Sequence, residues 1–79
     1  MFGKHRSLKR LLKTYHMKPA ETIYIGDEVR DIEACRKAKV QIIAVTWGFN
    51  SKRILERAKP DFIADKPEDI VKIVKALRG

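Results

Sequence analysis

Two hydrophobic patterns alternate along this chain. Three short apolar runs, rich in β-branched residues, are typical of strands buried on both faces. Longer segments between them carry apolar residues at the i, i+3, i+4 and i+7 spacing, which gives a helix one hydrophobic face. The predicted order is helix 5–16, strand 22–25, helix 28–38, strand 41–45, helix 51–58, strand 61–64 and a last helix that begins near residue 67.

Strands that alternate with helices predict a parallel sheet joined by right-handed crossovers. Pro19 bars continuation of the first helix, Ser51 is a plausible N-cap, and Pro67 fits the first turn of the last helix. The expected fold class is therefore α/β, a Rossmann-like three-layer sandwich with a parallel sheet of about three strands and flanking helices. At 79 residues the chain has room for one small domain with a marginal core.

The composition bears on whether the protein is associated with a membrane and on its cellular location. The chain is 44% hydrophobic and 35% charged, and no apolar run approaches the ~20 residues that a membrane span needs. We therefore expect no membrane partner. The one cysteine, Cys35, has no internal disulfide partner and is spaced as a small core residue, so a reducing, cytoplasmic location is expected.

The net charge of +8 fits a partner that is nucleic acid, an anionic membrane or a phosphorylated molecule. The cations are spread over the polar faces of predicted helices, which is more typical of solvated surfaces. A basic nucleic-acid-binding module and a small protein-interaction module on a Rossmann-like shell remain alternatives. The first of these lacks a recognition motif and an aromatic stacking platform.

The candidate functional residues follow the first predicted strand. Gly26 permits a tight turn and the close approach of a ligand. Asp27 would lie at the carboxyl end of the strand, the edge at which open α/β sheets bind ligands. Asp31 follows in the first turns of the helix and can point back to the same place. Two carboxylates there suit Mg²⁺, which takes one or two carboxylates together with water and substrate phosphate.

A simpler interpretation stays open at this point. Asp27 and Glu28 could cap the helix and complement its dipole, with Arg30 and Asp31 on the surface. Likewise, the aromatic pair Trp47 and Phe49 could line a pocket or cap the core.

Two motifs of the chain resemble the haloacid dehalogenase-like (HAD) phosphatases of the phosphoglycolate phosphatase type. Phe2-Gly3-Lys4, ahead of an amphipathic helix, resembles the third motif of that family. The segment Gly26-Asp27-Glu28-Val29-Arg30-Asp31 resembles the fourth, and residues 44–49 and 60–63 resemble the strand ends that follow. The resemblance runs from Phe2 to about Val71 and implies a HAD-like, Mg²⁺-dependent phosphatase core.

This resemblance assigns roles to three residues. Lys4 would be the catalytic and phosphate-binding lysine, which contacts the nucleophile and the transferring phosphoryl group. Asp27 would be a direct ligand of Mg²⁺, and Asp31 a second or water-mediated one. Lys39 stands where the family often has a glycine, so a left-handed backbone there would cost about 1 kcal/mol.

Other parts of the family pattern are missing from these residues. The nucleophile and the general acid/base of the family are two aspartates in an Asp-x-Asp motif, which occurs nowhere in the 79 residues. The second motif and the cap domain have no counterpart either. We therefore expect residues 1–79 to form a single partial domain, the C-terminal half of a HAD core. Such a domain would be inactive alone on the phosphorylated small molecule that the complete enzyme would hydrolyse.

The resemblance also carries an expectation about partners. In the family the strand at 22–25 lies beside the strand that carries the nucleophile. Without that neighbour its edge would be bare, and bare edges pair with other chains. We expect self-association, or else a complementary N-terminal fragment that supplies the missing half.

Overall fold

A parallel three-stranded sheet forms the centre of the structure, a computed structural model that describes residues 4–79. The central strand β2 (Gln41–Val45) pairs in parallel with β1 (Ile23–Gly26) on one side and with β3 (Phe62–Ala64) on the other. In the register of the sheet, Gly26 lies opposite Ala44, and Val45 lies opposite Ala64. The carboxyl ends of all three strands therefore meet at one edge.

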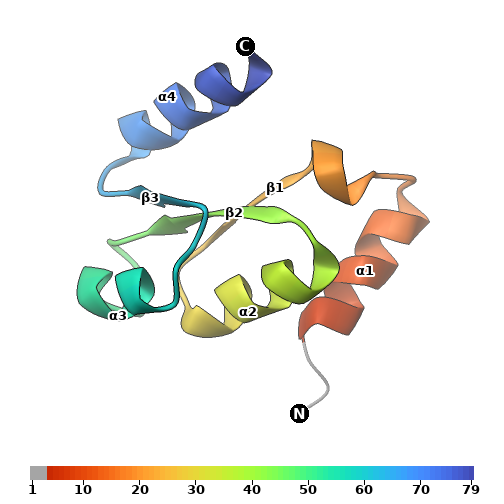
Figure 1. Cartoon of the computed structure of the whole chain (residues 1–79), viewed down its shortest axis with the longest axis horizontal. Helices are drawn as coiled ribbons and strands as arrows, with labels where there is room; N and C mark the ends of the chain where they lie inside the picture. The colour runs from red at the N-terminus through yellow and green to blue at the C-terminus, as the bar shows by residue number, and fades with distance from the viewer. Residues whose placement is uncertain (1–3) are drawn as a thin grey trace.

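Helices cover both faces of this sheet, so the predicted α/β fold with three layers is confirmed. Figure 1 shows α4 on one side of the strands and α2 and α3 on the other, with α1 packed beside α2. The elements follow one another in the predicted order, and their bounds lie within one or two residues of the predicted ones. The helices are α1 (Lys4–Thr14), the short 3₁₀ helix η1 (Pro19–Glu21), α2 (Val29–Ala38), α3 (Lys52–Arg57) and α4 (Pro67–Arg78).

Left-handed residues follow three of the helices: His16 after α1, Lys39 after α2, and Lys59, with a φ of 56°, after α3. His16 has a φ of 55°, and the Met17 N–H donates to Leu12 O at 2.8 Å, which ends α1 two residues earlier than the apolar spacing predicts. Lys39 has a φ of 60°, and the Val40 N–H donates to Cys35 O at 2.9 Å. Both are the six-to-one bonds that close a helix through a left-handed residue. The left-handed conformation considered for Lys39 is thus present.

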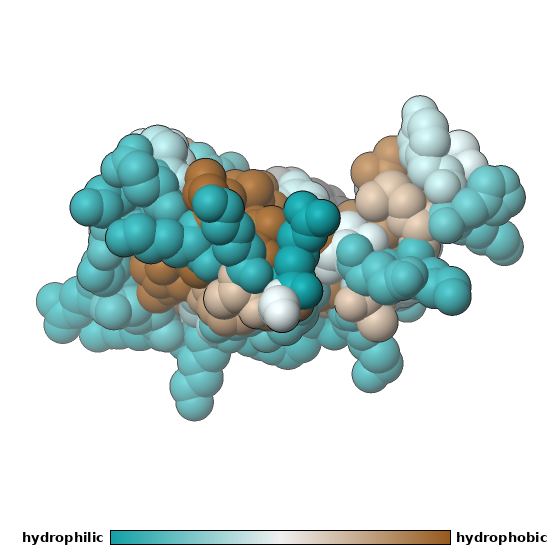
Figure 2. Space-filling model, turned by 90° about the horizontal axis from the view of Figure 1, so that it is seen from above, coloured by the Kyte–Doolittle hydropathy of each residue, from teal (hydrophilic) through white to brown (hydrophobic). Residues whose placement is uncertain are grey.

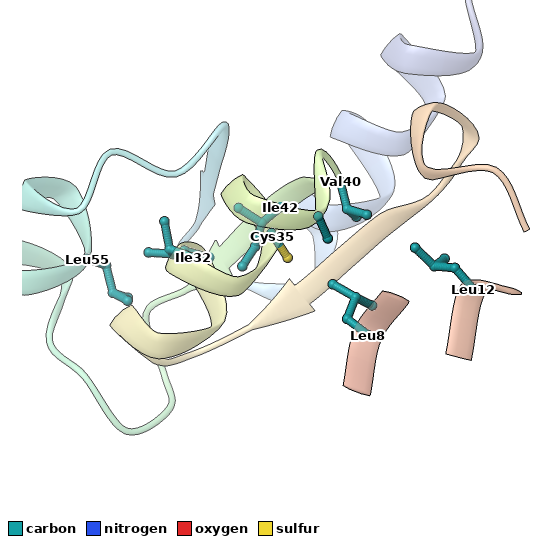
Figure 3. Close-up of a cluster of buried hydrophobic side chains, with 9 residues drawn as sticks. Leu8, Leu12, Ile32, Cys35, Val40, Ile42 and Leu55 are labelled. Carbon is teal, nitrogen blue, oxygen red and sulfur yellow. The ribbon is translucent and has the colours of Figure 1, made fainter. Parts of the chain in front are cut away.

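The core is divided by the sheet because successive residues of a strand point to opposite faces. Ile42 and Ala44 of β2 face α1, α2 and α3, while Ile43 and Val45 face α4. The first cluster is the larger and includes Leu8, Leu12, Ile32, Cys35, Val40 and Leu55 (Figure 3). Strand β2 is therefore buried on both faces, as its unbroken apolar sequence predicts.

The second cluster is thinner and leaves part of the sheet uncovered. Helix α4 has no fully buried residue and packs through Ile70, Ile73 and Val74. Ile25 of β1 remains 48% exposed. Viewed from above, hydrophobic side chains remain visible among the polar ones (Figure 2). The apolar surface is therefore incompletely covered around β1.

Cys35 lies inside the first cluster with 1% of its surface exposed, which confirms it as a core residue. Burial raises the pKa of its thiol to about 11, and the nearby carboxylates of Asp31 and Asp61 add to that shift. The thiol is therefore protonated and unreactive at neutral pH. Within residues 4–79, no helix is both long and apolar enough to cross a bilayer.

Lys39 offers a direct test of the backbone. Glycine adopts the left-handed conformation without the steric cost that a Cβ brings. We therefore expect Lys39→Gly to raise the free energy of unfolding by about 1 kcal/mol, measured by urea denaturation. Lys37→Gly, within α2, should lower it by about 0.5–1 kcal/mol. A loss of stability in Lys39→Gly would contradict the left-handed assignment.

Candidate functional site

Asp27 stands at the carboxyl end of β1, where the chain turns into α2. Its Oδ2 accepts a hydrogen bond from the Phe49 N–H at 2.9 Å, and its backbone carbonyl accepts one from the Asn50 N–H at 3.0 Å. These bonds tie the end of β1 to the loop that follows β2. The other carboxylate oxygen, Oδ1, has no hydrogen-bond partner among residues 5–79, whose side chains the structure describes, which leaves it available to a ligand.

Asp31 is held behind this turn, in the first turn of α2. Its side chain is only 4% exposed, and its Oδ2 accepts from the Glu28 N–H at 3.2 Å. The Tyr24 hydroxyl lies 3.5 Å from Oδ1, at the outer limit of a hydrogen bond. Asp31 is therefore not a surface residue. As expected, Glu28 is the N-cap of α2, and it forms a capping box with Asp31, whereas the Asp27 carboxylate bonds to the loop after β2 instead.

Two glycines make room for these two carboxylates. A Cβ on Gly26 would lie 2.6 Å from Oδ2 of Asp31, and a Cβ on Gly48 would collide with the side chain of Asp27. Neither glycine has a positive φ, so space, not backbone conformation, is what excludes a side chain. At the end of β1, the side chains of both aspartates thus occupy space that any residue larger than glycine at position 26 or 48 would fill.

Asn50 completes the turn at Asp27. Its Oδ1 accepts from the Val29 N–H at 2.9 Å, which satisfies one of the amides that a helix leaves unpaired at its start. Sequence reasoning missed both Asn50 and Gly48, because each acts on a residue more than 20 positions away. A glycine and an asparagine in a loop after a strand are also common turn residues, so the local pattern carries no distinguishing signal.

A second group of polar residues lies at the ends of β2 and β3. Asp65 accepts from the Thr46 hydroxyl at 3.1 Å and forms an ion pair with Lys52 at 3.0 Å. The Lys52 ammonium, followed by the Thr46 hydroxyl, lowers the pKa of the Asp65 carboxyl, and Asp65 in turn raises the pKa of Lys52. Both groups are therefore charged at neutral pH. This arrangement, too, was not predicted from the sequence.

The prediction for Lys4 falls at the limit of what the structure describes. The backbone of Lys4 begins α1, but its side chain lies outside the described residues, as do Phe2 and Gly3. At the next position, slight burial and the cations Lys37, Lys9 and Arg6 lower the pKa of His5. The start of α1 thus lies near the last turn of α2, and the role of Lys4 stays a prediction.

The aromatic residues of the loop after β2 do not cap the core. Trp47 is 50% exposed and Phe49 is 78% exposed, so neither caps the core.

The carboxylates of Asp27 and Asp31 can be compared with the number and type of protein ligands that different metal ions need. Within residues 4–79 there is no group of three or more His, Cys, Asp or Glu side chains placed to hold a metal ion. Asp27 and Asp31 alone are a two-carboxylate set. That set fits Mg²⁺, which keeps several waters and binds few protein groups, and it does not fit a structural zinc site, which needs four protein ligands.

Related proteins place the chain in context. The phosphoglycolate phosphatase of Synechococcus elongatus is 39% identical over 77 residues, which are 98% of this chain and 36% of that protein. The pyrophosphatase PpaX of Bacillus mycoides is 33% identical over 72 residues, 91% of this chain and 34% of its own length. The chain thus spans about a third of the length of the curated relatives that it matches.

Solved structures agree with the sequence relatives. A haloacid dehalogenase-like hydrolase of Streptococcus pneumoniae superposes with a TM-score of 0.85 at 32% identity. It covers 91% of this chain, and this chain covers 34% of it. A protein described as a predicted phosphatase of Clostridium acetobutylicum gives a TM-score of 0.87 at 25% identity, with 92% and 34% coverage. The three-stranded fold therefore recurs inside larger proteins.

A match to a protein-family model identifies the family of this chain. The model described as haloacid dehalogenase-like hydrolase matches residues 1–45, which is more than half of the chain and includes β1 and both candidate carboxylates. Together with the relatives and the solved structures, this match shows that the chain belongs to the haloacid dehalogenase-like hydrolase family.

Proposed function

We propose that this chain supplies the Mg²⁺- and phosphate-binding part of a phosphatase that hydrolyses phosphate monoesters of small molecules. The observation that supports this most directly is the Oδ1 of Asp27, which has no partner among the described residues at the carboxyl end of a parallel strand. Asp31, held immediately behind the same turn, adds a second negative charge. Relatives named as a phosphoglycolate phosphatase and a pyrophosphatase fit the same reaction class.

Each residue has a distinct task in this proposal. Asp27 and Asp31 would hold Mg²⁺, the former directly and the latter as a second or water-mediated ligand. A divalent ion bound there offsets the charge of the phosphoryl oxygens. Lys4 would contact the phosphoryl group and add positive charge near it. The bonds from the Phe49 and Asn50 amides keep Asp27 oriented before any ligand arrives.

The chemistry itself needs a group that these residues lack. Phosphoryl transfer to an aspartate requires that aspartate, and no Asp-x-Asp motif occurs in the 79 residues. We therefore propose that the 79-residue chain binds the metal ion but does not hydrolyse a phosphate ester by itself. Removal of a nucleophile lowers enzymatic rates by many orders of magnitude.

Metal binding is the first prediction of this proposal. Mg²⁺ at ten times its dissociation constant should stabilise the folded chain by about 1.4 kcal/mol, seen as a rise in Tm of several degrees. Asp27→Asn should abolish that rise, because it removes the charge of the direct ligand and retains an acceptor for the Phe49 N–H. Asp65→Asn, at the same edge of the sheet, is the matched control and should respond as the parent does.

Gly48 gives a test that leaves every carboxylate in place. A methyl group on residue 48 collides with the side chain of Asp27 and must displace it. We expect Gly48→Ala to lower the affinity for Mg²⁺ at least tenfold in a calorimetric titration, in a chain that still folds. An unchanged affinity would show that Asp27 is not the ligand.

Activity is the third test. Incubation of the 79-residue chain with p-nitrophenyl phosphate and Mg²⁺ should release no nitrophenol above the rate in buffer. Turnover that disappears in Asp27→Asn would contradict the proposed inactivity, since it would mean that these residues contain a complete catalytic set.

A further inference from the structure

A pocket of about 260 Å³ lies at the edge of the sheet opposite Asp27. It is located where α2 leads into β2 and where α3 leads into β3, so it borders the amino ends of both strands. Strand β2 spans five residues, which separates this pocket from the carboxyl end of the sheet by about 13 Å along the strand. The pocket is therefore distinct from the candidate metal site.

The buried residues that line the pocket are apolar. They belong to the first core cluster and are labelled in Figure 3: Ile32, Cys35, Val40 and Ile42. The exposed residues that line it carry charge, three of them positive and one negative: Arg36, Lys39, Lys59 and Asp61. The pocket thus combines an apolar interior with a charged opening.

The positive charges of this opening exceed the negative one. Among residues 5–79, the side chains of Lys39 and Lys59 form neither a hydrogen bond nor an ion pair. The Asp61 carboxylate is already engaged, because its Oδ2 accepts from the Ile42 N–H at 2.8 Å. Three cations and one anion leave an excess of two positive charges.

Arg36 is held in place at the pocket. Its Nη2 donates to Ala58 O at 2.7 Å and to Lys59 O at 3.3 Å. A guanidinium has five N–H groups, and the side chain of Arg36 makes no other hydrogen bond within residues 5–79. A cation that is fixed in this way loses little conformational freedom when it binds a ligand.

Two helix ends near the pocket act against an anion, but more weakly. Helix α2 ends at Ala38 and α3 at Arg57, and the carboxyl end of a helix carries at most about half a negative charge. Two such ends equal about one negative charge, which is less than the excess of two. The Val40 N–H and the Arg36 guanidinium also bind carbonyls at these ends. The pocket therefore remains positive.

The backbone at both lysines is unusual. Lys39 has a φ of 60° and Lys59 a φ of 56°, a conformation that glycine adopts without steric cost. Among the described residues, the one other non-glycine residue with a positive φ is His16. Residues held in such conformations cluster at ligand-binding sites, and two of these three lie on one pocket.

We propose that this pocket binds a small organic anion. Its phosphate or carboxylate group contacts Arg36, Lys39 and Lys59, and its apolar part lies against Val40 and Ile42. The volume is slightly below the range of about 300–1,000 Å³ that is typical of ligand pockets, which restricts the ligand to a small molecule. This site goes beyond the proposed function, since it needs neither Asp27 nor a metal ion.

The experiment is an NMR titration of the 79-residue chain with phenyl phosphate, in buffer freed of divalent ions. We expect saturable changes in the amide chemical shifts of residues 35–42 and 58–61. Inorganic phosphate, which lacks an apolar part, should bind more weakly than phenyl phosphate. Benzyl alcohol, which lacks a charge, should not bind.

A variant that relieves the backbone separates binding from folding. Lys39→Gly combined with Lys59→Gly removes two cations and places glycine at both left-handed positions, so the chain should resist urea at least as well as the parent. We expect the affinity for phenyl phosphate to fall at least tenfold. The matched control, Lys72→Gln combined with Lys75→Gln, removes two cations from α4 and should leave the affinity unchanged.

Asp61→Asn should act in the opposite direction. It removes the negative charge of the pocket and retains an acceptor for the Ile42 N–H. We expect phenyl phosphate to bind about threefold more tightly, which is the factor for removing one charge about 6 Å away in water. Weaker binding by this variant would contradict the proposal.

The other outcomes decide the proposal as well. It is overturned if no saturable shift occurs, or if the shifts are centred outside residues 35–42 and 58–61. It is also overturned if both double variants lose affinity equally, because net charge alone would then attract the anion. Equal affinity for phenyl phosphate and inorganic phosphate would exclude an organic ligand.

Discussion

Strand β2 is buried on both faces, and this burial determines where the ends of the other strands lie. Ile42 and Ala44 pack against one helical layer and Ile43 and Val45 against the other, and this strand lies in the middle of the sheet. Parallel pairing on both sides then brings the ends of β1, β2 and β3 to one edge. Asp27, Thr46 and Asp65, which follow the three strands, therefore lie at the same edge of the sheet. The packing of β2 between the two helical layers is what brings them there.

At that edge, structural and functional roles overlap in the same side chains. Asp31 caps α2 through the Glu28 N–H, and Asp27 joins β1 to the loop after β2 through the Phe49 N–H. Each carboxylate is close to a glycine that leaves it space. An aspartate oriented by backbone amides loses little freedom when it binds an ion, which is the advantage of preorganisation. The capping role of Asp31 therefore does not compete with the proposed metal site, since it fixes the carboxylate behind the same turn.

Much of the fold could be predicted from the sequence because it depends on local patterns. The apolar runs located the strands, and the helical spacing of apolar residues located α1, in which Leu8 and Leu12 are buried. Ser51 marked the start of α3, where it accepts from the Ile54 N–H at 3.4 Å. The contacts of Gly48, Asn50 and Asp65 could not be predicted, because each depends on how distant loops meet. Exposure of Trp47 and Phe49 was missed for a similar reason, since nothing local indicates how far a loop projects from the sheet.

Paramagnetic broadening of backbone amide signals by Mn²⁺ would show directly whether a divalent ion binds at the carboxyl end of β1. Mn²⁺ replaces Mg²⁺ at oxygen ligands, and it broadens only nearby signals. Substoichiometric Mn²⁺ should first broaden the amide signals of residues 26–31 and 48–50, and Asp27→Asn should prevent this broadening. Broadening centred instead on the acidic start of α4, at Glu68 and Asp69, would show that the ion does not bind at the carboxyl end of β1.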